Sequence, residues 1–167
     1  NLGIVEGDAT FGVLWYHVSE YFRIQAKGSL FIGIYPKPVD PTTHTFDEVE
    51  LVQNFAEGKV RQAAIFLDVP FLSTDLPKVQ TVVTRLQAAE KPLNVLFTAD
   101  IKLFADASTL PDLTSLLSPN VSVVIGQDGS AKGAALYISE GYSISTIGAT
   151  LGTVSLSQVS ESIAWVG

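Results

Sequence analysis

Residues 63–99, AAIFLDVPFLSTDLPKVQTVVTRLQAAEKPLNVLFTA, contain the pattern that decides the fold class. Two short apolar runs, 63–69 and 93–99, flank a segment whose valines and leucines recur at helical spacing. Runs this short and this continuously apolar are typical of strands that are covered on both faces, as in a parallel sheet. Ser73 or Thr74 can cap the helix between them. The stretch therefore predicts a strand, a crossover helix and a second, parallel strand.

The same alternation of strand-like and helical spacing extends to both ends of the chain. Further strands are predicted at residues 30–35 and 121–125. Helices are predicted around the strands, at residues 8–27, 45–57, 73–91, 110–117, 131–139 and 144–161. We therefore expect a single α/β domain over residues 1–167, a three-layer sandwich with a mostly parallel sheet of about four core strands and helices on both faces.

Two of these helices have apolar faces that the spacing identifies. The second helix is expected to begin at Thr45, with Glu48 completing a capping box. Its buried residues are predicted to be Phe46, Val49, Val52 and Phe55. The first helix is expected to bury residues that recur every three or four positions, namely Phe11, Leu14, Trp15, Val18 and Phe22.

Composition excludes several classes of function. The chain has no cysteine, so disulfides, thiolate zinc sites, iron–sulfur clusters and cysteine nucleophiles are excluded. A net charge of -7 argues against nucleic-acid binding, which normally requires a basic surface. Charged residues make up 16% of the chain, whereas about 25% is typical of globular domains. Together with a mean hydropathy of +0.32, this low charge favours a subunit that is covered by neighbours.

The chain begins at Asn1 and contains no methionine, which predicts a trimmed core fragment of a longer protein. No charged region followed by an apolar run marks a signal peptide at the start. Residues 141–160 carry no charge and are long enough to cross a bilayer. Because serine, threonine, glutamine and glycine interrupt this stretch, we interpret it as a buried helix and expect no membrane insertion.

Three aspartates are candidates for a metal site. Asp68, Asp100 and Asp128 each lie near the carboxyl end of a predicted strand, and open parallel sheets bind ligands at the carboxyl ends of their strands. Converging carboxylates suit Mg²⁺, which would make the chain a small receiver-like or phosphatase-like domain. The competing interpretation is that aspartate simply favours the turns that follow strands. No second acid adjoins Asp68, so we prefer that interpretation.

The other candidate sites have simpler interpretations. The loop at 126–133 lies where phosphate loops occur, but it matches neither the Walker pattern nor the dinucleotide pattern. His17 and His44 lack a spaced partner ligand, and no Gly-x-Ser-x-Gly elbow accompanies them. We therefore predict no catalytic residue and no cofactor. Four aromatic residues of the first helix could form a binding surface, although core packing is the preferred interpretation: Trp15, Tyr16, Tyr21 and Phe22.

The C-terminal stretch at 147–166, IGATLGTVSLSQVSESIAWV, is the most distinctive part of the chain. Gly148, Gly152 and Ser155 form a ridge of small residues beside an apolar stripe. Glycine within a helix costs about 1 kcal/mol relative to alanine. Two glycines four residues apart therefore indicate close approach by a packed neighbour, which is either the sheet of this domain or another subunit.

This stretch resembles the end of the core domain of contractile phage tail-sheath-like proteins. The resemblance lies in the small-residue helix, the turn at 159–163 and Trp165. It implies a structural subunit and not an enzyme, with Gly148, Gly152, Ser155 and Trp165 as packing or interface candidates. Sheath subunits of a phage tail or phage-tail-like injection system stack in helical rings around an inner tube.

The resemblance also implies partners and a location. The expected partners are other copies of the chain, an inner tube protein and baseplate components. The expected location is a virion tail, or the bacterial cytoplasm as an assembled sheath. In that family, terminal arms add strands to neighbouring subunits, and we expect such arms to lie outside this chain.

Overall fold

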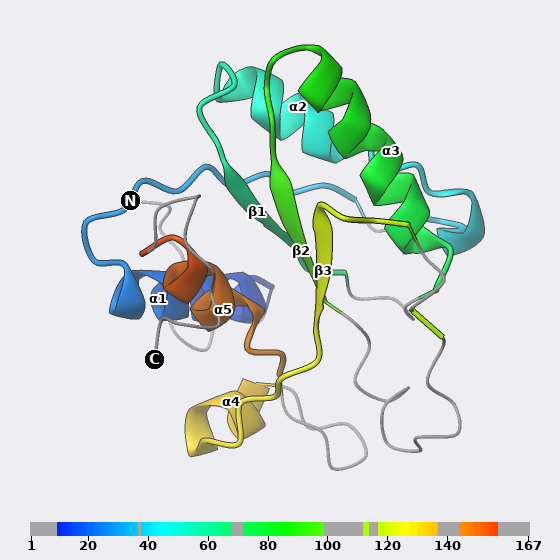
Figure 1. Ribbon diagram of the computed structural model, residues 1–167. Coiled ribbons are helices and arrows are strands. Elements are labelled where there is room, and N and C mark those ends of the chain that lie inside the picture. Colours follow the sequence, from blue (N-terminus) through cyan, green and yellow to red (C-terminus); the bar gives the residue numbers. More distant parts are fainter. Residues whose placement is uncertain are drawn as a thin grey trace. The chain divides into compact units, whose positions relative to one another are not determined.

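The computed structural model describes residues 10–36, 38–67, 72–98, 112–113, 117–136 and 144–156 (Figure 1). The fold is α/β with a three-stranded parallel sheet, which confirms the predicted class. The chain groups into two compact units, one formed by residues 1–28 with 124–167 and the other by residues 29–123. The single domain expected over residues 1–167 stays a prediction.

The sheet has the order β1-β2-β3, with bounds Gln62–Ile65, Asn94–Thr98 and Val121–Val124. β1 and β2 are parallel, and their register places Gln62 opposite Asn94 and Ile65 opposite Phe97. At the other edge, the backbone N–H of Val95 donates to the carbonyl of Asn120 at 2.9 Å. These three strands agree with the strands predicted at 63–69, 93–99 and 121–125.

The strand predicted at 30–35 is wrong. Residues 30–36 have no regular secondary structure and no strand pairing, so the described residues form three strands and not four. The segment lies against helix α2 (Glu48–Phe55), where the rings of Phe31 and Phe55 are 6.4 Å apart. A strand needs a neighbouring strand for its hydrogen bonds, and this segment has side-chain contacts with a helix in its place.

Helix α3 (Asp75–Ala88) supplies much of the core of residues 29–123 and confirms the helix predicted at 73–91. It lies beside α2 in Figure 1. Thr74, one of the two predicted caps, occupies the N-cap position, but its side chain makes no capping hydrogen bond. The carboxylate of Asp75, 1% exposed, accepts from the backbone N–H of Leu72 at 3.1 Å. The buried core residues are Phe46, Leu76, Val79, Val82, Val83, Leu86, Leu93, Val95 and Phe97.

Helix α2 follows the short 3-10 helix η1 (Pro41–Thr43) and differs from prediction at both ends. The expected capping box is absent, because the Thr45 hydroxyl donates to Asp47 at 2.7 Å and Glu48 contacts His44. Phe46 is buried as predicted, with a φ of 62°. The prediction for Phe55 is wrong, since this side chain is 81% exposed.

The polar residue Gln53 is buried near the end of α2, a position that the apolar spacing did not predict. It is only 1% exposed. Its amide nitrogen donates to the carbonyls of Val60 at 2.9 Å and Lys91 at 3.2 Å, and its amide oxygen accepts from the Val60 N–H. Because the hydrogen bonds of the amide are satisfied, its burial does not carry the free-energy cost of an unpaired polar group.

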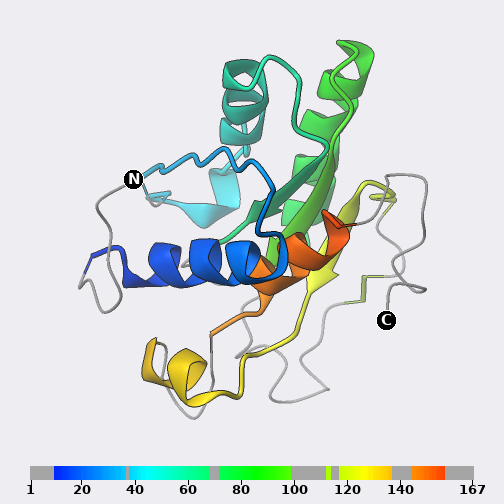
Figure 2. The same ribbon diagram turned by 90° about the vertical axis from the view of Figure 1, so that its left-hand side faces the viewer.

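The other compact unit contains α1 (Gly12–Ile24), α4 (Ala131–Leu136) and α5 (Ile147–Val154). α1 and α5 pack side by side (Figure 2). An antiparallel bridge joins Gln127 to Ser145. Among the described residues, no helix is long and apolar enough to cross a bilayer. Most of the helix predicted at 110–117, and the end of the one predicted at 144–161, lie outside the described residues.

The buried face of α1 differs from the predicted one. Phe11 and Phe22 are each 38% exposed. The buried residues of the helix are Gly12, Tyr16, Glu20 and Tyr21. The apolar residues of α1 recur around most of the helix, so spacing alone did not identify the side that meets α5.

Candidate functional site: the α1–α5 crossing and its polar cluster

The small-residue ridge of α5 packs directly on the backbone of α1. A Cβ atom added at Gly148 would lie 2.8 Å from the Cα of His17, and one added at Gly152 would lie 3.0 Å from the carbonyl oxygen of Tyr21. Both glycines are buried. The close neighbour of the two glycines is therefore α1 of the same chain, and not the sheet or another subunit as we expected.

Ser155, the third residue of the ridge, also makes its contacts within this unit. Its hydroxyl donates to the carbonyl of Gly152 at 2.8 Å. Its own carbonyl accepts from the side-chain amide of Gln25, at the end of α1, at 3.0 Å. Trp165, the remaining interface candidate, lies outside the described residues. The end of α5 is thus tied to the end of α1 by the Gln25–Ser155 hydrogen bond as well as by close packing.

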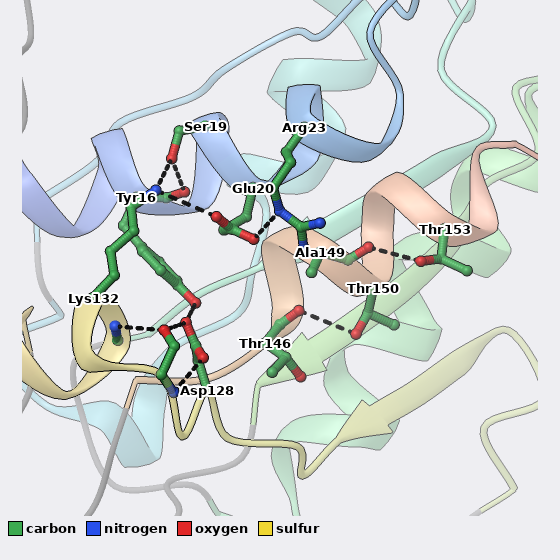
Figure 3. Close-up of polar contacts among 12 residues, drawn as sticks. Tyr16, Ser19, Glu20, Arg23, Asp128, Lys132, Thr146, Ala149, Thr150 and Thr153 are labelled. Carbon is green, nitrogen blue, oxygen red and sulfur yellow. Dashed lines mark hydrogen bonds and ion pairs between the residues drawn. The ribbon is translucent and has the colours of Figure 1, made fainter.

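A cluster of polar side chains lies beside this crossing, and we call it the Tyr16 cluster (Figure 3). Together with Thr146 and Ala149, five of its members line an open hollow of about 270 Å³. α1 supplies three of its residues, and the segment 128–132, at the start of α4, supplies the others. The cluster consists of Tyr16, Glu20, Arg23, Asp128, Ser130 and Lys132.

Tyr16 and Asp128 form the central contact of the cluster. The phenol of Tyr16, 1% exposed, donates to Oδ2 of Asp128 at 2.6 Å. Burial, followed by the hydrogen bond to Asp128, raises the pKa of Tyr16 well above its usual value. The same hydrogen bond, with help from the backbone N–H of Ser130, lowers the pKa of Asp128. Near neutral pH the phenol therefore keeps its proton and the carboxylate keeps its charge.

Glu20 connects two cations within the cluster. It is 8% exposed, and its carboxylate accepts from Nε of Arg23 at 2.7 Å and from Nζ of Lys132 at 3.3 Å. Lys132 also lies over the ring of Trp15, with its Nζ 4.7 Å from the ring centroid. A carboxylate with this little exposure requires such partners, because an unpaired buried charge is costly.

Of the three aspartates in the metal-site hypothesis, the structure describes the surroundings of Asp128. Both carboxylate oxygens of Asp128 already accept hydrogen bonds, Oδ1 from the N–H of Ser130 at 2.8 Å, and Oδ2 from the hydroxyl of Ser130 at 2.9 Å and from Tyr16. Asp68 and Asp100 lie outside the described residues, so the three-aspartate site stays a prediction. Within the described ranges, no group of three or more His, Cys, Asp or Glu residues is placed to hold a metal ion.

The loop at 126–133 is a turn held by its own side chains. Asp128 accepts from Ser130 as described above, and the hydroxyl of Ser130 accepts from the N–H of Gly133 at 3.3 Å. The backbone of Asp128 is fixed in turn, because its N–H donates to the carbonyl of Ile144 at 2.9 Å. These bonds support the interpretation of this loop as a glycine turn that leads into a helix.

The two histidines have different environments. His17 lies on α1 against α5, and burial lowers its pKa to about 4. Nearby Glu20 raises this pKa, but burial outweighs it. In the other unit, Nε2 of His44 lies 3.0 Å from the carboxylate of Glu48, and its ring lies 4.2 Å from that of Phe46.

The first-helix aromatics divide into two groups. Tyr16 and Tyr21 are buried, at 1% and 5% exposure, which confirms the core interpretation for them. Trp15 is partly buried and covered by Lys132, whereas Phe22 is more exposed. The sequence reasoning missed the roles of Glu20, Arg23 and Lys132. The three-residue spacing of Glu20 and Arg23 is a detectable signal for one ion pair, but nothing local indicates the second partner.

Comparison of the chain with protein-family models, with curated proteins and with solved structures finds no match. The functional assignment therefore depends on the residues and contacts of the chain itself.

Proposed function

We propose that this chain is a structural subunit of a contractile tail sheath, in a phage tail or a phage-tail-like injection system. It assembles into helical rings around an inner tube and uses no catalysis and no cofactor. Its partners are other copies of itself, an inner tube protein and baseplate components. The assembled sheath belongs to a virion tail or to the bacterial cytoplasm.

The observation that carries the proposal is the packing of the sheath-like stretch. The resemblance rests on a small-residue helix, and Gly148 and Gly152 of that helix contact the backbone of α1 closely. Such packing joins residues 12–24 and 147–154 in one unit.

The Tyr16 cluster supports a structural role for the same unit. Its two carboxylates are paired with a phenol, a hydroxyl and two cations, and its central phenol keeps its proton near neutral pH. General acid–base groups usually have a pKa near the working pH. In this cluster, burial and the hydrogen bond to Asp128 raise the pKa of Tyr16, whereas hydrogen bonds lower the pKa of Asp128, so both pKa values lie away from neutrality. This arrangement favours a structural role, in which the cluster holds the turn against the helix, over a role in proton transfer.

Reconstitution tests the proposal. The full-length protein that contains this chain is combined with its tube protein and baseplate components, and the products are imaged by negative-stain electron microscopy. We expect sheathed tubes from the wild-type protein and from a Gly129→Ala variant, because a Cβ at position 129 meets nothing within 4 Å. Gly148→Leu should abolish sheath formation. A full-length protein that leaves the tubes bare and stays monomeric contradicts the proposal.

A further inference from the structure

An apolar surface on residues 29–123 has no role in the packing described so far. We call it the α2 surface and define it as Phe31, Ile34, Tyr35, Leu51 and Phe55. Leu51 and Phe55 are 56% and 81% exposed and lie one turn apart on α2. Phe31, Ile34 and Tyr35, on the extended segment before it, are 39%, 58% and 42% exposed.

The segment and the helix form one continuous surface. The rings of Phe31 and Phe55 meet edge to face, with centroids 6.4 Å apart. A Cβ added at Gly33 would lie 2.6 Å from Cγ2 of Val52 and 2.6 Å from the Tyr35 ring. The extended segment therefore lies directly on α2, with its aromatic side chains next to those of the helix.

Among the described residues, no backbone–backbone hydrogen bond involves residues 30–36, although this segment is strongly apolar. Backbone N–H and C=O groups at a surface require water or a partner chain. Contiguous exposed apolar side chains are typical of a surface that another protein covers.

Charge indicates the kind of partner. The chain has a net charge of -7, yet the α2 surface contains no charged residue, and residues 29–36 contain none either. On the first turn of α2, the carboxylate of Glu50 lies 3.0 Å from Arg85, which also contacts Asp47, and the carboxylate of Glu48 lies 3.0 Å from Nε2 of His44. Like charges placed opposite each other oppose association. An uncharged surface is therefore where a second, equally acidic copy meets least repulsion.

The exposed area of the α2 surface is consistent with one of several contacts that each copy makes in an assembly. At roughly 200 Å² for each fully exposed large side chain, the five residues present about 500 Å². A standard stable interface takes about 800 Å² from each partner. A single contact of this size gives weak association, whereas repeated contacts in an array add up to a stable assembly.

We infer that the α2 surface is a contact surface for a second copy of this chain. The inference rests on the proposed function and names the surface that subunits of the assembly use. Other occupants, such as the inner tube or a membrane, are outcomes that the test distinguishes.

The first experiment measures self-association. Sedimentation equilibrium of the chain should show weak, reversible association, and a Leu51→Ser/Phe55→Ser variant should weaken it at least about tenfold. Gln87→Ser, at an exposed polar position on α3, is the control and should leave it unchanged. Circular dichroism checks that the variants fold, which we expect because both apolar side chains are largely exposed. A wild-type chain that stays monomeric, or a double variant that associates like wild type, overturns the inference.

The second experiment identifies the occupant directly. Because the chain has no cysteine, a Phe55→Cys variant carries a benzophenone photo-crosslinker at one defined site. Crosslinking in assembled sheaths should join two copies of the chain, and a Gln87→Cys control should not. Crosslinks to the tube protein or to lipid alone overturn the inference.

The two proposals fail in different ways. Sheaths that form normally from the Leu51→Ser/Phe55→Ser variant contradict the α2 contact and leave the sheath function standing. If the protein self-associates through the α2 surface but never sheathes a tube, the sheath function is contradicted and the α2 contact is supported.

Discussion

At the scale of single residues, Tyr16 and Asp128 are 112 positions apart in the chain, and they form the central hydrogen bond of the polar cluster. The phenol is buried and the carboxylate is charged, so the bond fixes the turn at 128–130 against α1. A hydrogen bond to a charged group contributes about 1.5–3 kcal/mol to stability.

We predict that Tyr16→Phe lowers the free energy of unfolding by about that amount. The substitution keeps the aromatic ring, so the fall in the free energy of unfolding measures the contribution of the hydroxyl group alone. Urea denaturation checks the value, with Tyr35→Phe as the matched control, because the Tyr35 side chain is 42% exposed and makes no described hydrogen bond. Equal effects from the two substitutions would show that the Tyr16–Asp128 bond contributes nothing.

His17 makes stability depend on pH. Its pKa is about 4 in the folded chain and 6.5 when exposed, because burial disfavours the charged ring. The unfolded chain therefore binds more protons between these two values, and stability falls as the pH drops from about 6.5 to about 4. The full loss is about 3 kcal/mol, at 1.36 kcal/mol for each pKa unit.

This pH dependence can be measured by urea denaturation at a series of pH values. Substituting His17 with leucine should remove the fall in stability between pH 6.5 and pH 4 that the histidine causes. His44→Gln serves as the control and should retain that fall. If the wild-type chain and the His17→Leu variant show the same slope over this range, His17 is not the group responsible.

At the scale of elements, the crossing of α1 and α5 depends on the absence of side chains at two positions. An alanine at 148 gains about 1 kcal/mol in helix propensity but forces its Cβ into the backbone of α1. Overpacking typically costs about 1–3 kcal/mol. The clash is with backbone atoms of His17, which cannot move away as the end of a flexible side chain does.

We therefore predict that Gly148→Ala destabilises the chain by up to about 2 kcal/mol, and that Gly152→Ala, whose new Cβ would meet its nearest atoms at 3.0 Å, has a smaller effect. Thermal or urea unfolding measures both. Gly129→Ala is the control, since nothing lies within 4 Å of that position. A stabilising effect of Gly148→Ala would mean that helix propensity dominates and that α1 moves aside easily.

At the scale of the whole molecule, an acidic chain that associates through an uncharged surface should respond to salt in a characteristic way. Raising the salt concentration from about 0.01 M to about 1 M shortens the Debye length from about 30 Å to about 3 Å, which screens repulsion between copies. We predict that self-association stays constant or strengthens over this range. Sedimentation equilibrium at both salt concentrations measures the change, and a contact made by ion pairs would weaken instead.

The sequence by itself determined the α/β class, the strands near 63–69, 93–99 and 121–125, and α3 between the first two. These features follow from short apolar runs and from helical spacing, which act over a few neighbouring residues. The presence of a tight neighbour for Gly148 and Gly152 was also predictable, because glycine within a helix has a cost that packing must offset.

Only the tertiary structure decided which neighbour those glycines meet, which side of α1 is buried, and what Asp128 binds. Each depends on contacts between residues more than a hundred positions apart, as the Tyr16–Asp128 bond does, and no local pattern encodes them. The segment at 30–35 shows the same dependence. Its sequence suits a strand, but strand formation requires a paired neighbour, and in this chain the segment lies on α2 with Phe31 against Phe55.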